Sequence, residues 1–216
     1  MAKEVEKVGL HCFAPIRMLG KGSFGEVFLV QRKSTKKYYA MKVLMKSKII
    51  GQNLIKYAYA EKNVQSTLAH PFIVRLHCSF QTVARLFLIL DYCPGGDLGR
   101  ILQMEKKFTK ERTKTYIAEV LLAIQELHNR EIIYRDLKPD NVVIDSEGHA
   151  LLTDFGLSKE GIKDTDFTQS FCGSVAYLAP EVLRKSGHGK SVDWYLLGTL
   201  LYEMLVGKPP YFNRNK

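Results

Sequence analysis

Alternating apolar and polar positions near the start of the chain predict a set of β-strands. Apolar, β-branched and aromatic residues gather in runs separated by glycine-rich or basic turns, at 13–19, 24–32, 37–45, 71–80 and 85–92. Apolar residues at helical spacing from Leu54 to Leu68 predict one helix among these strands, and His70-Pro71 ends it. The first part of the chain is therefore expected to form a β-rich unit with one helix.

The pattern becomes mainly helical after Pro94. A long amphipathic helix is expected from Thr109, a suitable N-cap, to His128. Its apolar face contains Tyr116, Ile117, Val120, Leu121, Ile124 and Leu127. Short strand-like runs at 141–145 and 149–153 then precede an irregular stretch that reaches about residue 180.

The most apolar segment of the chain runs from Trp194 to Val206. It is shorter than a bilayer-spanning helix needs, and it contains Glu203. Because apolar side chains occupy every side of the expected helix, the sequence predicts a helix buried all round and no membrane segment.

Composition places the chain among soluble globular proteins. Its 216 residues are 46% apolar and 25% charged, which is enough chain for one or two domains with a substantial core. Lys and Arg outnumber Asp and Glu by 32 to 22, a net charge of +10 that would suit a nucleic acid, an anionic membrane or a polyanionic small molecule. The basic residues are dispersed, and the densest cluster, Arg32 to Lys37, has the composition of a hairpin turn. We therefore expect no nucleic-acid partner.

Cysteine usage favours a reducing compartment. The four cysteines, Cys12, Cys78, Cys93 and Cys172, form no C-x-x-C pair. His-Cys neighbours occur at 11–12 and 77–78, but adjacent side chains of a strand point to opposite faces, which does not favour a metal site. The first residues, MAKEVEKVGL, lack the apolar core of a signal peptide and have no Gly after Met. The expected location is the cytoplasm, with the nucleus as the alternative.

The segment LGKGSFGEV at 19–27 contains a G-x-G-x-x-G pattern. Glycines let backbone N–H groups approach phosphate oxygens, although the pattern alone is equally typical of an ordinary turn. A dinucleotide-binding fold needs a helix directly after the glycines, whereas a strand continues here from Glu26 to Val30. The pattern therefore predicts a hairpin folded over phosphate, with Val27 facing a base.

Lys42 lies in the middle of the expected strand 37–45, with Ala40 on the same face. Such a lysine usually extends its ammonium group to solvent, and that interpretation stays open without a partner. Glu61 on the expected helix is a candidate partner. A strand-to-helix pair of this kind would hold an ammonium group against phosphate.

These motifs stand in an order that resembles the eukaryotic protein kinases. The glycines are followed by Lys42, Glu61, YRDLKPDN at 134–141, DFG at 154–156 and APE at 179–181. The resemblance covers the chain from about Phe13 to its end. It implies an α+β, bilobal fold with a short N-terminal extension (1–12), a β-rich N-lobe with one helix (13–92) and a mainly helical, partial C-lobe (93–216).

The resemblance also assigns roles to residues. Asp136 would orient the substrate hydroxyl and accept its proton, Lys138 would lie beside the transferring phosphoryl group, and Asn141 and Asp154 would hold magnesium. Lys42, held by Glu61, would contact the phosphates of ATP. The nucleotide-binding set is Leu19, Gly20, Gly22, Ser23, Phe24, Gly25, Val27, Ala40, Lys42, Asp91, Cys93, Asp97 and Val143, with Leu90 as the gatekeeper.

Within the family, the chain resembles serine/threonine kinases of the AGC group. Lys138, Tyr134, FCGS at 171–174 and AYLAPE at 176–181 carry that resemblance. It implies that Asp97, Asp140 and Glu203 accept basic residues upstream of the phosphoacceptor in a protein substrate. It also implies that an upstream kinase phosphorylates Ser170, with Arg135 and Lys159 placed to receive the phosphate.

The chain departs from the family pattern at three places. Gln65 stands where the family usually has a large apolar residue, so the position of the helix that carries Glu61 is expected to be less secure. Val175-Ala176 replaces a common Pro-Glu, which removes one acidic group. The chain stops at Lys216, before the remaining C-lobe helices, so we expect either a fragment of a longer product or a gene model that is cut short.

Two other functions remain as alternatives. A pseudokinase, or a scaffold module that binds nucleotide without transfer, is favoured by Gln65 and by the missing C-lobe helices, whereas the filled catalytic positions argue against it. A small-molecule phosphotransferase could share Asp136 and Asn141, but it would not need the long segment from Asp154 to Glu181.

Overall fold

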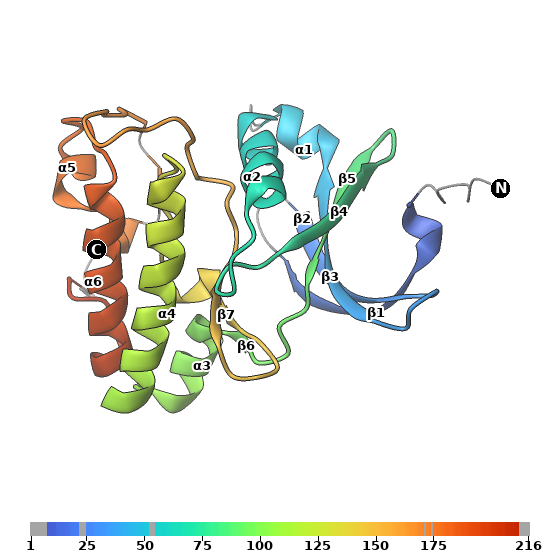
Figure 1. Cartoon of the computed structure of the whole chain (residues 1–216), viewed down its shortest axis with the longest axis horizontal. Coiled ribbons are helices and arrows are strands. Elements are labelled where there is room, and N and C mark those ends of the chain that lie inside the picture. The colour runs from blue at the N-terminus through green and yellow to red at the C-terminus, as the bar shows by residue number, and fades with distance from the viewer. Residues whose placement is uncertain (1–7, 22–24, 52–54, 171, 174, 212–216) are drawn as a thin grey trace.

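The computed structural model of the chain describes residues 8–21, 25–51, 55–170, 172–173 and 175–211. In chain order the elements are η1 (Leu10–Cys12), β1 (Phe13–Lys21), β2 (Gly25–Arg32), β3 (Tyr38–Met45), α1 (Lys46–Gly51), α2 (Ile55–Thr67), β4 (Leu76–Gln81), β5 (Arg85–Asp91), β6 (Gly96–Asp97), α3 (Leu98–Glu105), α4 (Lys110–Asn129), η2 (Pro139–Asn141), β7 (Val142–Ile144), β8 (Ala150–Leu152), η3 (Val175–Tyr177), α5 (Pro180–Leu183) and α6 (Ser191–Val206). The sheet-rich first part lies on one side of the molecule and the long helices α4 and α6 on the other (Figure 1). The α+β, two-part architecture is the predicted one.

The first part is built on a five-stranded antiparallel sheet in the order β1-β2-β3-β5-β4. The basic cluster at 32–37 forms the β2–β3 hairpin turn, as predicted, because the N–H of Lys36 donates to Arg32 O (2.8 Å) and the N–H of Arg32 to Lys37 O (2.9 Å). Strand β4 begins at Leu76 rather than at residue 71. The residues before it instead pair with β8, where the N–H of Val74 donates to Leu152 O (2.9 Å).

The two faces of the sheet have separate apolar clusters. Side chains from Phe13, Val30, Met41, Val43, Phe87 and Ile89 form one of them. Leu88 and Leu90 belong to the other, which also includes Val74 and Leu151 from outside the sheet. Because successive side chains of a strand alternate between faces, Lys42 shares the second face with Ala40, as the sequence predicted.

The prediction of a single helix in this part was incomplete. Helix α1 precedes α2 and spans six residues, KSKIIG. It is shorter than two turns and buries only Ile49, so it leaves no periodic apolar pattern in the sequence. Helix α3 was also missed, although Asp97 caps it by accepting a hydrogen bond from the N–H of Arg100.

Helix α4 begins where its cap was predicted. The hydroxyl of Thr109 accepts from the N–H of Arg112 at 3.3 Å. The buried face includes Val120, Ile124 and Leu127. Leu121, which the periodicity placed on the same face, is 38% exposed.

Helix α6 packs beside α4 and is not buried on all sides, which corrects the prediction (Figure 1). Leu196, Leu197, Leu200 and Met204 face the core, whereas Trp194, Leu201, Tyr202, Leu205 and Val206 are 37–45% exposed. Apolar residues all round the helix cannot show which sides meet a neighbour. None of the described helices is both long enough and apolar enough to cross a bilayer.

A small sheet, β6-β7-β8, joins the two parts. Gly95 and Gly96 precede it in a tight connection. A Cβ at Gly95 would lie 2.6 Å from Cβ of Ile144, and Gly96 has φ +78, so both positions favour glycine. This sheet brings the segments after β7 and β8 close to the five-stranded sheet.

Candidate active site

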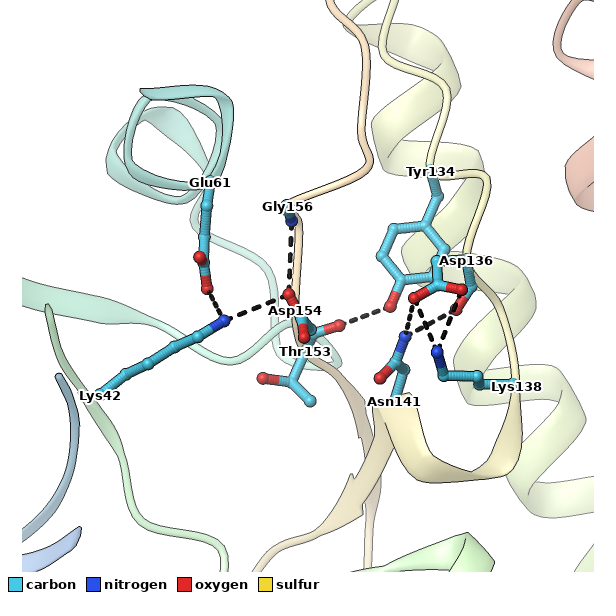
Figure 2. Close-up of polar contacts among 9 residues, drawn as sticks. All are labelled: Lys42, Glu61, Tyr134, Asp136, Lys138, Asn141, Thr153, Asp154 and Gly156. Carbon is cyan, nitrogen blue, oxygen red and sulfur yellow. Dashed lines mark hydrogen bonds and ion pairs between the residues drawn. The ribbon is translucent and has the colours of Figure 1, made fainter. Parts of the chain in front are cut away.

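The segment IIYRDLKPDN leads from the core to a cluster of polar side chains around Asp136 (Figure 2). The ammonium group of Lys138 lies 2.9 Å and 3.1 Å from the two carboxylate oxygens of Asp136. The side-chain amide of Asn141 donates to the same carboxylate (2.8 Å) and to the Asp136 carbonyl (2.7 Å). Burial raises the pKa of Asp136, and the hydrogen bonds from Lys138 and Asn141 oppose that rise. The charged residues after the apolar run therefore converge on one carboxylate.

A fully buried carboxylate from α6 holds this segment in place. Asp193 is 0% exposed and accepts hydrogen bonds from the backbone N–H groups of Tyr134 (2.9 Å) and Arg135 (2.8 Å). The ring of His128 gives it a third contact at 2.8 Å. These contacts satisfy a buried charge and support the positive φ of Arg135, +71. The sequence analysis did not identify Asp193, although an acid beside the most apolar segment was a usable signal.

Lys42 bridges the two parts of the molecule. Its ammonium group lies 2.5 Å from Glu61 on α2 and 3.2 Å from Asp154 (Figure 2). Burial by itself lowers the pKa of Lys42, but the two carboxylates more than offset this and raise it. The charge of Lys42 in turn lowers the pKa of Asp154. Lys42 therefore stays a cation and Asp154 an anion across the physiological range.

Asp154 and Asn141 have the donor atoms that magnesium prefers. The amide nitrogen of Asn141 is used on Asp136, which leaves its oxygen for a cation, and one oxygen of Asp154 accepts from Lys42 and from the N–H of Gly156 (3.4 Å). Mg²⁺ takes oxygen ligands, commonly one or two from side chains with the rest from phosphates and water. No trio of His, Cys, Asp or Glu converges on a point in the described residues. The residues fit a metal bound together with a nucleotide.

The glycine-rich segment is described only at its two ends. Gly22, Ser23 and Phe24 lie outside the described residues, while Leu19 is partly buried at the end of β1. A Cβ at Gly20 would meet no atom of the described residues within 4 Å, and Gly20 pairs with Val27 of β2. At Gly25 a Cβ would lie 1.9 Å from Val43 O, so strand packing alone requires this glycine.

Three residues assigned to the adenine site lie on one apolar cluster. Ala40, Cys93 and Val143 are partly buried against the cluster that contains Leu90. Val27 is partly buried on β2 and pairs with Lys42. Burial raises the pKa of the Cys93 thiol to about 12, so it remains protonated.

The side chain of Asp91 is turned away from this cluster. It contacts the ring of His77 (2.6 Å) and accepts from the N–H of Arg75 (3.0 Å). The N–H of Asp91 also has a partner, because it donates to Arg75 O at 3.1 Å.

Two acidic side chains meet where α3 packs against η2. A Cβ at Gly99 would be 3.1 Å from Asp140 Oδ1 and 3.2 Å from Asp97 Oδ1, so these two carboxylates approach the same point. Glu203 accepts a hydrogen bond from the hydroxyl of Tyr177 at 2.7 Å. Burial raises the pKa of Glu203, and nearby Asp140 adds to the rise. The structure thus brings Asp97, Asp140 and Glu203 together, and adds Tyr177 as a contact that the sequence analysis did not foresee.

The two cationic side chains predicted to receive a phosphate on Ser170 contact different hydroxyl groups. Arg135 donates to the hydroxyl of Ser170 through Nη1 and to Leu157 O through Nε (2.8 Å). Lys159 instead donates to the hydroxyl of Thr168 (2.8 Å), which lies 3.2 Å from that of Ser170. Ser170 is exposed and Thr168 is buried. Ser174, a neighbouring hydroxyl, is outside the described residues.

Gln65 lies one helical turn beyond Glu61 on α2 and is 2% exposed. Neither its amide nitrogen nor its amide oxygen has a hydrogen-bond partner among the described residues. A buried polar group without a partner costs about 1–3 kcal/mol. The departure noted in the sequence is therefore a physical defect in the packing of α2.

The chain matches the family described as protein kinase domain over residues 13–216. It is 50% identical over 214 residues to the RAC family serine/threonine-protein kinase homolog of Dictyostelium discoideum, an alignment covering 99% of this chain and 48% of that protein. Serine/threonine-protein kinase Sgk1 of Xenopus tropicalis is 48% identical over 204 residues, 94% of this chain and 49% of the relative. Serine/threonine-protein kinase Sgk3 of Rattus norvegicus is 49% identical over 201 residues, 93% and 40%. The chain thus spans about half the length, or less, of these relatives.

Proposed function

The chain belongs to the protein kinase family, and from this premise we propose that it transfers the γ-phosphoryl group of Mg-ATP to Ser or Thr hydroxyls of proteins. The relatives described above are named serine/threonine-protein kinases, and the sequence resembles the AGC group of these enzymes. The observation that carries the proposal is the arrangement in Figure 2, where the cation Lys42 with Asp154 faces the carboxylate of Asp136 with Lys138 and Asn141.

Each of these residues has a distinct task in the proposed reaction. Lys42 holds phosphate oxygens, and Glu61 and Asp154 fix its position. Asp136 accepts the proton of the attacking hydroxyl, and its raised pKa makes it a better base than an exposed carboxylate. Lys138 provides a fixed positive charge beside the transferred group. Asn141 and Asp154 hold the magnesium ion, which neutralises phosphate charge when it is bound.

We propose that the protein substrate has basic residues upstream of its phosphoacceptor. The acids Asp97, Asp140 and Glu203 lie beside the catalytic loop and support this preference. The whole chain carries a charge of +10, which repels a basic peptide at long range. The acidic group must therefore act at short range, where screening by salt is weak.

We also propose an upstream kinase that phosphorylates Ser170, which is exposed and already contacts Arg135. We propose that the protein acts in a reducing compartment, the cytoplasm or the nucleus. Its four free cysteines support this location.

The function is tested with Mg-ATP, a basic peptide and the variant Asp136→Asn. Wild-type chain should phosphorylate the peptide, while Asp136→Asn should lose turnover and keep its nucleotide affinity, because Lys42 and the apolar cluster are unchanged. Asp164→Asn, whose carboxylate is 90% exposed, is the matched control. Nucleotide binding without turnover in the wild type would instead identify the pseudokinase alternative.

A positional peptide library tests the substrate class. We expect selection for Arg or Lys upstream of the phosphoacceptor and loss of that selection when Asp140 and Glu203 are both replaced by the amides. Selection for acidic or proline-directed sites in the wild type would contradict the proposed substrate class.

A further inference from the structure

Helix α2 carries Glu61, and few of its described side chains are both buried and apolar. The side chains of α2 that the structure describes include three buried ones, Glu61, Val64 and Gln65. Only Val64 of these is apolar. Ile55 and Tyr59, nearer the start of the helix, are exposed. Among the described side chains of α2, burial of apolar surface is therefore limited to Val64, next to the two polar side chains.

The other end of α2 is held separately. A guanidinium nitrogen of Arg130, which follows α4, donates to Thr67 O at 3.1 Å. Leu68, directly after the helix, is buried in the main core cluster. The helix is thus tied to the helical part of the molecule at its C-terminal end, and the contact of Glu61 with Lys42 is its polar tie to the sheet.

Gln65 and Glu61 have opposite effects on the equilibrium between the docked and undocked states of α2. Docking of α2 gives Glu61 a partner at 2.5 Å, but it leaves both amide atoms of Gln65 without one among the described residues. When the helix moves away from the core, the amide regains hydrogen bonds to water and the Glu61–Lys42 contact breaks. The amide therefore favours the state in which Lys42 is unsupported.

We infer that Gln65 is a positioning residue that weakens the docked state of α2 and so lowers basal activity. The effect on activity rests on the proposed kinase function, because only then is Lys42 a phosphate contact. An unpartnered buried amide shifts the docking equilibrium about five- to 150-fold toward the undocked state. The enzyme then depends on further contacts, such as those of a phosphate on Ser170, to reach full activity.

The first experiment measures docking without catalysis, by hydrogen exchange of the α2 amides. In an Asp136→Asn background, Gln65→Met keeps the length of the side chain and removes its polar group. We expect exchange over residues 55–67 to slow about fivefold or more and the unfolding temperature to rise. Gln65→Leu is the second apolar variant, in case one of them packs poorly.

Two variants serve as controls for this experiment. Gln103→Met makes the same change at an exposed position of α3 and should leave α2 exchange unchanged. Gln65→Glu keeps a polar group at the buried position and should not slow exchange. Unchanged or faster exchange in both Gln65→Met and Gln65→Leu would overturn the inference.

The second experiment measures activity with Ser170→Ala, so that phosphorylation cannot compensate. Here Gln65→Met should raise kcat about fivefold or more with the KM for peptide unchanged, because the change acts on Lys42 and not on peptide contacts. Slower exchange without turnover in any variant would support the inference and reject the proposed function. Turnover that is insensitive to Gln65→Met, with unchanged exchange, would reject the inference alone.

Discussion

The ion contacts of Lys42 single it out for a test of the proposed phosphate binding. Its ammonium group meets two carboxylates, at 2.5 Å and 3.2 Å, and it is the cation of this cluster. Loss of Lys42 removes the positive charge itself, whereas loss of the Glu61 charge leaves the ammonium group in place but less well held. The two substitutions should therefore differ in severity.

We predict that Lys42→Met lowers kcat/KM for ATP by about 100-fold or more, since charge-assisted hydrogen bonds contribute about 1.5–3 kcal/mol each. Glu61→Gln should lower kcat/KM for ATP by only about tenfold, because the contact of Lys42 with Asp154 remains. Steady-state kinetics with ATP as the varied substrate measure both. Lys62→Met changes an exposed neighbour on α2 and is the control. Equal rates for wild type and Lys42→Met would mean that other groups hold the phosphates.

The hydroxyls of Ser170 and Thr168 lie close together but differ in access. Ser170 is exposed and contacts Arg135, whereas Thr168 is buried and contacts Lys159. We predict that treatment with an activating kinase raises the kcat of Thr168→Ala by about tenfold or more and leaves the kcat of Ser170→Ala unchanged. The reason is that two charge-assisted contacts to a phosphate on Ser170 would order the segment. Phosphopeptide mapping locates the site. Full stimulation of Ser170→Ala would show that another residue is phosphorylated.

Between elements, the clearest electrostatic tie joins α4 to the β7–β8 hairpin. Glu119 on α4 is buried, and it accepts from the N–H of Ala150 (2.8 Å) and contacts the ring of His149 (2.6 Å). The hydrogen bond to Glu119 raises the pKa of His149. The folded state therefore binds the His149 proton more tightly than the unfolded state does.

This contact predicts a pH dependence of stability. The stabilisation by protonated His149 is fully present below its unfolded pKa of about 6.5 and is lost as pH rises through the raised folded pKa. Urea unfolding of wild type should show a falling free energy of unfolding over that range, and His149→Gln should show a smaller fall. His11→Gln, at an exposed histidine, is the control. Identical slopes for His149→Gln and wild type would remove this contact as the cause.

At the scale of the whole molecule, we expect the exposed apolar side of α6 to govern solution behaviour. Five large apolar side chains on this helix are 37–45% exposed, whereas the opposite side of α6 packs against α4. Exposed apolar patches of this kind promote association between molecules.

We predict that the 216-residue chain self-associates through this side of α6. Leu201→Lys with Leu205→Lys changes two positions one turn apart and should shift the chain toward the monomer in sedimentation or light scattering. Met104→Lys alters an exposed apolar residue of α3 and should have no such effect. A chain that is already monomeric, or an associated state unaffected by the double variant, would contradict the prediction.

Much of the architecture was predictable because it depends on neighbours along the chain. Runs of apolar, β-branched and aromatic residues between turns predicted the strands of the five-stranded sheet. Thr109 marked the start of α4 because a cap contacts the backbone only three residues on. The order of the motifs identified Lys42, Asp136 and Asn141 as a candidate site. Short elements such as α1, with six residues, fell below what periodicity can show.

By itself the sequence determined the types of the long elements, the family and the residues around which the site is built. Only the tertiary structure decided which side of α6 is covered, that Lys159 contacts Thr168, and that Gln65 lacks a partner. It also brought Lys42 to Asp154 across 112 residues of chain, and Asp193 to Arg135 across 58. Local patterns record a residue's surroundings along the chain. The partner of a buried polar group depends on how distant segments pack, and no local pattern contains that information.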